Sequence, residues 1–537
     1  MDGCAGEFPS GSGYYYAAYG VKSDPWDESE GGVAVLGSGA IRIAQGVEFD
    51  YCCVKAVEAL RRRGIRAIMM NVNPETVSTD HDISDALYLE PLYVDDALAV
   101  LERERARGVF ACFGGQTSLR LGLDLAAQGI KLLGPDQEVI DAAEDRGKFS
   151  RLLKKLDISQ PEGVDVASVE EARRVGMELG YPLMVRPSFV IGGVAMKAVY
   201  SEEEMLEVLS AAFEAVPGQK VMVDRFLQGK EFECDAVCDG EDVLIPGIFE
   251  HIDPSGIHSG DSIAVFPSFS LSDEQQKKIL DTVRMISKEL DIHGLLNIQF
   301  VLKDGTFRII EANPRASRTV PICSKISKIP MVDLAVGVAL GEKLSEMGHG
   351  TGILPKNGQW GVKVPVFSND KLPGIDPKLG PKMMSTGESL GLGDDLADAM
   401  MDGLRGAGWL PPVKGRILMS VADSQKAESM PVASQFTSLG WSVDATSGTA
   451  EYLLQWGIGV TAVPQEDLVG RLRKGDWDLV LNIPGGNDRH IRHGAELRRS
   501  ASAAGVPCLH SIAAAWAVAN SLTKSLKCGS GKHEQKK

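Results

Sequence analysis

Short apolar runs alternate with amphipathic stretches in the first quarter of the chain. These runs occupy 33–39, 67–73, 109–115 and 131–134. A helical pattern from about Phe49 to Arg63 separates the first two. Alternation of short strands and helices is typical of a parallel α/β sheet. We therefore expect an irregular arm over 1–30 and a parallel α/β domain over 31–143.

The pattern changes after residue 143. A helical stretch near Glu144 to Leu156 is followed, from Pro182 to Pro314, by short β-rich runs with turn residues between them. Such runs favour antiparallel strands. The pattern predicts a second, mixed domain over 144–350, which ends in a helical and then glycine-rich segment.

The last third of the chain resumes the alternation of strands and helices. Residues 351–414 are rich in Pro, Gly and Asp, so we expect a linker of low regularity that extends the preceding domain. The alternation restarts at Gly415, which predicts a small α/β domain over 415–525 and a polar tail over 526–537. The predicted fold class is α/β and α+β, with several domains.

Composition narrows the class of protein. A chain of 537 residues is too long for one core, and Lys plus Arg (56) against Asp plus Glu (73) gives a net charge of −17, which opposes nucleic-acid binding. No apolar run is long enough to span a bilayer, and the first residues do not have the pattern of a secretion signal. The nine cysteines have no metal-site spacing. These features predict a cytoplasmic protein with reduced thiols.

The most informative segment is LNIQFVLKDGTFRIIEANPRASR, which has two β-rich runs around an Asp-Gly turn. Glu311 and Asn313 are two positions apart, so a strand points both to one face. A two-residue turn with regular pairing would place Gln299 opposite Ile310. An odd loop or a bulge would place Gln299 opposite Glu311 and gather three oxygen-bearing side chains, so we predict one of these irregularities.

A cluster of Gln299, Glu311 and Asn313 offers hard oxygen ligands, which suit Mg²⁺ or Mn²⁺ bound together with nucleotide phosphates. Arg315 and Arg318 would add cationic donors beside the metal ion, where a phosphoryl group and an anionic nucleophile need neutralisation. The alternative is a hairpin edge with solvated polar residues.

Two other segments could bind anions. In VRPSFVIGG, Arg186 precedes a loop with Gly192 and Gly193, whose backbone N–H groups could approach phosphate, although an ordinary hairpin turn has the same pattern. In GIHSGDS, His258 and Ser259 could hold an anion, although a single histidine is more often structural. Residues at a strand end that could contact a nucleoside are Asp224, Phe226 and Glu231. The glycines after residue 36 do not form a dinucleotide-binding motif, because Arg42 occupies a position that this motif reserves for glycine.

Together these segments resemble ATP-grasp enzymes and, more narrowly, carbamoyl-phosphate synthetases. The resemblance runs from about residue 3 to residue 523. Its motifs include RIAQGVEFDYCC, NVNPETVSTD, FGGQTSLRL, AEDRGKF, VRPSFVIGG, GIHSGDS, EANPRASRTVP, PGIDPKLGPKMMSTGE and DATSGTA. Several of them resemble the carboxyl-terminal, carbamoyl-phosphate half of the large subunit, and the last domain resembles its methylglyoxal-synthase-like regulatory domain. The chain is therefore similar to one part of a split large subunit.

The resemblance implies roles for individual residues. Those expected to bind ATP are Arg146, Arg186, Gly192, Gly193, Asp224, Phe226, Glu231, Gly256, Ile257, His258, Ser259, Gln299 and Glu311. Those expected to hold Mg²⁺ or Mn²⁺ are Gln299, Glu311 and Asn313. Those expected to act in catalysis are Arg315, which would orient carbamate, Arg318 and His258. Those expected to bind a nucleotide or ornithine effector are Lys426, Thr446 and Thr449.

The implied reaction is phosphorylation of carbamate by ATP. The implied partners are the amino-terminal half of the large subunit, which would make carbamate from bicarbonate and ammonia, and a glutamine amidotransferase subunit. The carbamoyl phosphate would serve pyrimidine and arginine synthesis. Two alternatives remain open, an ammonia-dependent homodimer that needs no partner and a nucleotide-binding regulatory subunit without turnover.

The sequence departs from the family pattern at a few positions. Ala40 and Ala44 stand in place of the usual Pro and Gly of the first glycine turn, and Val194 stands where Arg is common. In the last domain, VTAVPQEDLVGRL lacks an expected lysine. The departures concern a glycine-containing loop and effector control, and the residues expected to bind the metal ion match the family pattern.

Overall fold

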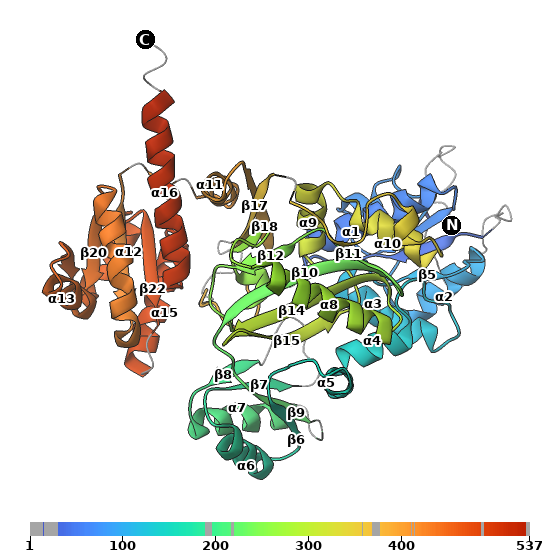
Figure 1. The fold of residues 1–537 in the computed structure, drawn as a ribbon, viewed down its shortest axis with the longest axis horizontal. Helices are drawn as coiled ribbons and strands as arrows, with labels where there is room; N and C mark the ends of the chain where they lie inside the picture. Colours follow the sequence, from blue (N-terminus) through green and yellow to red (C-terminus); the bar gives the residue numbers. More distant parts are fainter. Residues whose placement is uncertain are drawn as a thin grey trace. The chain divides into compact units, whose positions relative to one another are not determined.

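The computed structural model describes residues 14–15, 31–43, 45–187, 196–215, 218, 220–356, 358–367, 376–409, 411–412, 414–484 and 488–532. The chain divides into two compact units (Figure 1). The first comprises Met1–Phe249 and Pro267–Asn357, and the second comprises Glu250–Phe266 and Gly358–Lys537. Each unit is described by itself.

The first unit begins with a five-stranded parallel sheet in the order β1-β4-β3-β2-β5. Its strands are β1 (Tyr14–Tyr15), β2 (Val33–Leu36), β3 (Ala67–Asn71), β4 (Ala86–Leu89) and β5 (Val109–Phe110). The helices of this layer are α1 (Val47–Arg62), α2 (Val94–Arg103) and α3 (Gly115–Ala126). The predicted parallel α/β fold is confirmed, and β1 adds a short strand within the segment that we expected to be irregular.

A small antiparallel sheet follows, in the order β6-β9-β7-β8. Its strands are β6 (Gly163–Val166), β7 (Leu183–Pro187), β8 (Lys197–Val199) and β9 (Val221–Arg225). The helices α6 (Val169–Leu179) and α7 (Glu202–Ala215) cover one face of this sheet, and α4 (Gln137–Glu144) and α5 (Arg146–Lys155) precede it (Figure 1). The Asp145 side chain caps α5 by accepting a hydrogen bond from the Lys148 N–H at 2.8 Å, which places Arg146 in the first turn of that helix.

The rest of the first unit is built on a long antiparallel ladder of β10 (Lys230–Asp239), β14 (His293–Lys303) and β15 (Thr306–Asn313). Two short strands, β11 (Val243–Ile245) and β16 (Gly352–Ile353), extend it beside β10. The helices are α8 (Asp273–Glu289), α9 (Thr319–Ser327) and α10 (Met331–Ala339). The predicted antiparallel character is confirmed, and one face of the ladder packs into an apolar core that includes Phe232, Ile298 and Phe300.

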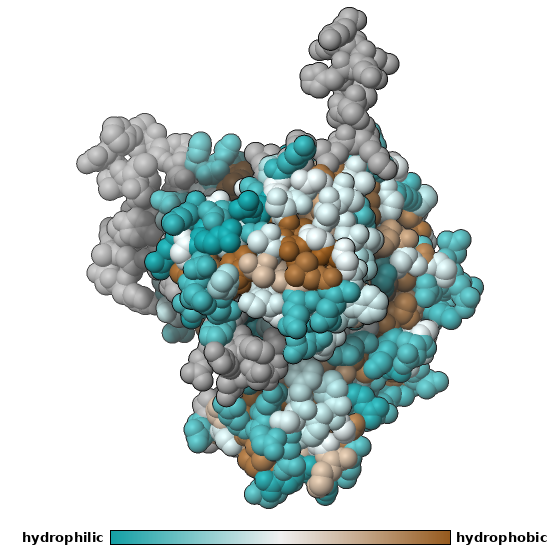
Figure 2. All heavy atoms as spheres, turned by 90° about the vertical axis from the view of Figure 1, so that its left-hand side faces the viewer, coloured by the Kyte–Doolittle hydropathy of each residue, from teal (hydrophilic) through white to brown (hydrophobic). Residues whose placement is uncertain are grey.

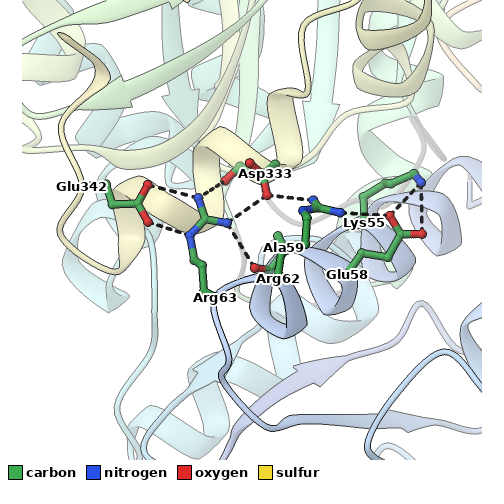
Figure 3. Close-up of polar contacts among 7 residues, drawn as sticks. All are labelled: Lys55, Glu58, Ala59, Arg62, Arg63, Asp333 and Glu342. Carbon is green, nitrogen blue, oxygen red and sulfur yellow. Dashed lines mark hydrogen bonds and ion pairs between the residues drawn. The ribbon is translucent and has the colours of Figure 1, made fainter. Parts of the chain in front are cut away.

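Ion pairs join α1 to α10 within this unit (Figure 3). The Arg63 guanidinium binds Glu342 Oε1 at 2.6 Å and Asp333 Oδ1 at 2.9 Å, and Arg62 binds the same Asp333 oxygen at 2.8 Å. Both acidic residues hold the pKa of Arg63 above its usual range. The carboxyl end of α1 is therefore fixed to the segment that follows the long ladder.

The second unit contains β13 (Ala264–Phe266), β17 (Trp360–Val366) and β18 (Gly387–Gly393), which pair in this order in antiparallel fashion after β12 (Ile248–His251) and the short helix η3 (Ser259–Asp261). Helix α11 (Leu396–Gly406) packs on β18. The predicted low regularity of 351–414 is wrong for β17, β18 and α11, which lie in this segment. A Cβ atom built on Gly391 would lie 2.0 Å from the Ala399 carbonyl oxygen, so the glycines of β18 allow a close helix contact rather than a flexible linker.

The carboxyl-terminal part of this unit is a parallel sheet in the order β21-β20-β19-β22-β23. Its strands are β19 (Arg416–Val421), β20 (Ser442–Thr446), β21 (Thr461–Val463), β22 (Leu479–Ile483) and β23 (Cys508–Leu509). Its helices are α12 (Lys426–Ser438), α13 (Ser447–Gln455), α14 (Leu468–Arg473), α15 (Asp488–Ala503) and α16 (Ile512–Lys532). The predicted small α/β domain is confirmed, and α16 continues into the segment that we expected to be a polar tail.

Figure 2 shows a mainly hydrophilic face on this carboxyl-terminal part, interrupted by separate hydrophobic areas. Large hydrophobic side chains exposed in this part include Leu454, Trp456 and Trp516. In the described part of the chain, no helix combines the length and the apolar character needed to cross a membrane.

Candidate functional site

The ladder of β14 and β15 has the predicted irregularity. A two-residue turn pairs Lys303 with Thr306, and the register shifts between Gln299 and Phe300. Gln299 consequently lies opposite Glu311, with Ile310 as the extra residue of a β-bulge. The bulge is confirmed, and it lies farther along the strand than the turn itself.

The bulge gathers the three predicted metal ligands on one face of the sheet. Asn313 Nδ2 donates to Glu311 Oε1 at 3.1 Å, and Gln299 stands directly opposite Glu311. This set has only one carboxylate, and the described residues contain no group of three or more His, Cys, Asp or Glu arranged to hold a metal ion. Such a donor set fits Mg²⁺ or Mn²⁺ that keeps phosphate and water ligands, rather than a permanently bound ion.

Two acidic residues on β10 extend this polar face, and sequence reasoning missed both. Glu233 lies opposite Gln299, and Asp235 lies opposite Asn297. Asn297 Nδ2 donates to Glu233 Oε1 at 2.7 Å and to Asp235 Oδ1 at 3.0 Å. Burial, reinforced by Glu233, raises the pKa of Asp235 to about 6. The signal was present in EFECDAVCD, where the acidic residues at 231, 233 and 235 alternate with apolar ones.

The two predicted catalytic arginines follow β15 and lie against acidic residues of earlier elements. Arg315 Nη2 donates to Asn313 Oδ1 at 3.1 Å, and its Nε lies 3.6 Å from Glu144 Oε1 at the end of α4. Arg318 Nη2 donates to Glu48 Oε1, at the start of α1, at 3.4 Å. No pattern in the sequence predicts Glu48 or Glu144 here, because both are distant from these arginines along the chain.

The predicted phosphate-binding arginines come together from two elements, Arg146 from the first turn of α5 and Arg186 from β7 of the small antiparallel sheet. Arg186 Nε on β7 lies 3.2 Å from Asp224 Oδ2 on β9. Burial, and then Arg186, lowers the pKa of Arg146, whereas Asp224 and Glu311 oppose that shift. Burial raises the pKa of Asp224, and the two arginines oppose it. The two guanidinium groups thus lie close together, with the acidic residues Asp224 and Glu311 near them. Guanidinium groups are suited to binding phosphate oxygens.

Other predicted nucleotide contacts stay predictions. Gly192 and Gly193 lie outside the described residues. Asp224 has Arg186 as its ion-pair partner, Phe226 N–H donates to the Pro182 carbonyl at 3.1 Å, and Glu231 lies opposite Val301 at the start of β10.

The GIHSGDS loop, which contains Gly256, Ile257, His258 and Ser259, belongs to the second unit. The ring Nδ1 of His258 accepts a hydrogen bond from the Gly260 N–H at 3.1 Å. The backbone N–H of His258 donates to the Gly380 carbonyl at 2.8 Å. Lys363 is buried and donates to the Ser259 carbonyl. The fully buried Asp261 carboxylate accepts hydrogen bonds from the N–H groups of residues 384 and 385 at 2.7 and 2.9 Å. The loop is thus fixed by the segment around 380–385.

The predicted effector residues meet at the carboxyl ends of β19 and β20. Thr446 Oγ1 donates to Thr449 Oγ1 at 3.2 Å, and Thr449 Oγ1 also accepts from the Val421 N–H at 3.1 Å. Lys426 Nζ pairs with Asp423 at 2.6 Å and lies 3.3 Å from where a Cβ atom on Gly448 would be. Their effector role stays a prediction.

Comparisons with known families cover most of the chain. The profile described as carbamoyl phosphate synthase preATP-grasp domain matches residues 29–142. The profile described as carbamoyl-phosphate synthase L chain, ATP binding domain, matches 145–347, and an MGS-like domain matches 428–510.

Curated relatives agree with these profiles. The carbamoyl phosphate synthase large chain of Thermoanaerobacter sp. (strain X514) is 44% identical over 524 residues, which are 98% of this chain and 49% of that protein. The large chain of Clostridium botulinum (strain Loch Maree / Type A3) is 43% identical over 533 residues, 98% of this chain and 50% of that protein. The chain thus spans about half the length of these relatives.

Solved structures share the fold at low identity. A biotin carboxylase complex from Campylobacter jejuni aligns with a TM-score of 0.55 and 16% identity, over 70% of this chain and 91% of that chain. N5-carboxyaminoimidazole ribonucleotide synthetase from Thermotoga maritima aligns with a TM-score of 0.51 and 13% identity, over 70% and 97%. At such identities the likeness concerns the fold alone.

Proposed function

Because the chain belongs to the family of carbamoyl phosphate synthase large chains, of whose length it spans about half, we propose that it phosphorylates carbamate with ATP, giving carbamoyl phosphate and ADP. It would correspond to the carboxyl-terminal half of the large chain. The observation that carries the proposal is the ligand face of Gln299, Glu311 and Asn313 with Arg315 bonded to it at 3.1 Å.

Each part of this face has a task in phosphoryl transfer. Gln299, Glu311 and Asn313 would hold Mg²⁺ or Mn²⁺, which neutralises phosphate oxygens when it is bound. Arg146 and Arg186 would bind the phosphates of ATP, and the closeness of their two guanidinium groups supports this role. Positioning and charge neutralisation supply most of the catalysis in such transfers.

Arg315 and Arg318 would neutralise the nucleophile. A carbamate oxygen forms a bond to the γ-phosphorus while the bond from that phosphorus to the β,γ-bridging oxygen breaks, and ADP leaves. Arg315 can orient the carbamate, because its guanidinium already bridges Asn313 and Glu144 at the ligand face. No covalent nucleophile from the protein is needed.

The complete reaction would need partners. We propose that an amino-terminal half of the large chain makes carbamate from bicarbonate and ammonia, and that a glutamine amidotransferase supplies the ammonia. The MGS-like domain, with Lys426, Thr446 and Thr449, would bind a nucleotide or ornithine effector. The half-length match to the relatives supports the need for a second half.

The test is ATP formation from ADP and carbamoyl phosphate with Mg²⁺. The chain should synthesise ATP, and Glu311→Gln should reduce the rate by at least about a hundredfold, because one amide replaces the only carboxylate of the ligand set. Glu346→Gln, an exposed matched change, should leave the rate intact. A folded chain that binds ADP and makes no ATP would overturn the proposal for the isolated chain.

A further inference from the structure

We propose that Asp235 is a positioning residue, which fixes the arginine-bearing loop and the amide of Asn313 through hydrogen bonds without touching the reactants. The inference rests on the proposed function. The residues that follow β15 carry both catalytic arginines, so whatever fixes that loop fixes their guanidinium groups.

The two carboxylate oxygens of Asp235 bind the loop at the residues that precede and follow Arg318. Ser317 Oγ donates to Asp235 Oδ1 at 2.6 Å, and Thr319 Oγ1 donates to Asp235 Oδ2 at 2.6 Å. All three side chains are buried, with Asp235 only 1% exposed. Arg318 therefore projects from a backbone segment that is held at the preceding and the following residue.

The same carboxylate acts on the metal-ligand face through Asn297. Asn297 Nδ2 donates to Asp235 Oδ1 at 3.0 Å, which turns Asn297 Oδ1 toward β15. That oxygen accepts from Asn313 Nδ2 at 3.4 Å, so Asn313 Oδ1 points to the other side, where Arg315 donates to it. The three residues Asp235, Asn297 and Asn313 are consecutive cross-strand partners, which keeps this relay within one sheet face.

A carboxylate suits this position better than an amide. Asp235 accepts three hydrogen bonds from described donors, and an ionised carboxylate offers about four lone-pair sites and no donor. Asparagine has one acceptor oxygen, and its NH₂ group would face at least one donor. A buried carboxylate is costly unless its hydrogen bonds are complete, and here they are directed to the elements that carry the site.

The experiment compares four variants of the full chain in ATP synthesis from ADP and carbamoyl phosphate. Asp235→Asn should lower kcat at least about tenfold, because small displacements of positioned groups are costly, while KM for ADP changes less than about threefold. Thr319→Val removes the hydroxyl at nearly constant shape and should behave like Asp235→Asn. Thr319→Ser keeps the hydroxyl and should recover most of the activity lost in Thr319→Val.

Asp239→Asn is the matched control. Asp239 is also a buried aspartate of β10, but it binds the N–H groups of residues 241, 242 and 344 at the far end of the strand. It should keep kcat near that of the unchanged chain. If Asp235→Asn does not fold, as judged by circular dichroism and ADP binding, the Thr319 pair decides alone.

The outcomes separate the two proposals. Suppose that the unchanged chain is active. Full kcat in Asp235→Asn would then overturn the positioning role, and so would equal losses of kcat in Thr319→Val and Thr319→Ser. In either case the proposed function would still stand. An inactive unchanged chain would count against the proposed function, and the inference that rests on it would fall with it. A kcat loss confined to Asp235→Asn and Thr319→Val supports the inference.

Discussion

Gln299 and Glu311 face each other across β14 and β15 only because Ile310 is an extra residue in the second strand. Regular pairing from the two-residue turn would place Gln299 opposite Ile310 and direct Glu311 to the other face. The ligand set thus depends on a local irregularity, and it contains a single carboxylate.

This single carboxylate leads to the first prediction. Gln299→Glu places a second carboxylate opposite Glu311 and should raise the affinity for Mn²⁺ without nucleotide by about tenfold, because hard cations bind more tightly to sites with more ligand charge. Electron paramagnetic resonance of free Mn²⁺ measures the change. Thr306→Glu makes the same charge change at an exposed position of β15. An equal rise in both variants would show a general field effect and contradict the specific site.

Sequence reasoning reached this hairpin because its information is local. The strand period of two and the chemistry of magnesium ligands together required the bulge between Gln299 and Glu311. Glu233 and Asp235 were not predicted, because they contact Asn297 of β14 across 62 to 64 residues of chain. Glu48 was not predicted for the same reason, since 270 residues separate it from Arg318.

The segment 351–414 was misjudged for a different physical reason. Its β18 sequence, GESLGLG, has the glycine content of a linker. In the fold, these glycines let α11 approach the strand backbone, since a Cβ atom on Gly391 would lie 2.1 Å from the Gly403 nitrogen. Composition alone cannot distinguish a flexible glycine from one that allows close packing.

The second prediction concerns the junction of α1 and α10 (Figure 3). Arg63→Met removes the ion pairs with Asp333 and Glu342. It should lower the local unfolding free energy of α10 by about 2 kcal/mol, because these partly buried pairs should contribute more than surface ion pairs and less than fully buried ones. Hydrogen exchange of the α10 amides, followed by mass spectrometry, measures it. Lys55→Met breaks the exposed pair with Glu58 and should change α10 by less than about 0.5 kcal/mol. Similar effects of both changes would refute a special role for Arg63.

The third prediction concerns a buried ion pair in the second unit. Arg498 is 1% exposed and binds Asp376 Oδ1 at 2.7 Å and Asn482 Oδ1 at 2.7 Å. Asp376→Asn should destabilise this unit by about 3 kcal/mol, because it leaves a buried cation without its counter-ion. The double variant with Arg498→Met should recover a large part of that loss, which a double-mutant cycle quantifies.

Urea unfolding followed by tryptophan fluorescence suits this measurement, because six of the seven tryptophans lie between residues 360 and 516. Additive losses in the double variant would mean that Asp376 stabilises the unit independently of Arg498.

The fourth prediction uses His510, which follows β23 in the same unit. Both ring nitrogens of His510 are buried without a hydrogen-bond partner among the described residues, and burial, with Arg498 nearby, lowers its pKa to about 4. In the unfolded chain a histidine takes up a proton near pH 6.5. Between these values the unfolded state binds more protons, so stability is lost as the pH falls from about 6.5 toward 4.

His510→Leu should remove this loss, since it fills a similar volume without a titrating group. We expect the melting temperature of the second unit to fall between pH 7 and pH 5 by about 5 °C more in the unchanged chain than in the variant. His493→Leu, at a partly exposed histidine of α15, should not reduce the fall. Because the neutral ring also leaves two buried nitrogens unpaired within the described part of the chain, His510→Leu should melt above the unchanged chain even at pH 8. If the melting temperatures of the unchanged chain and of His510→Leu fall equally across this pH range, His510 has a hydrogen-bond partner or solvent access in solution. The description of a buried neutral imidazole would then be wrong.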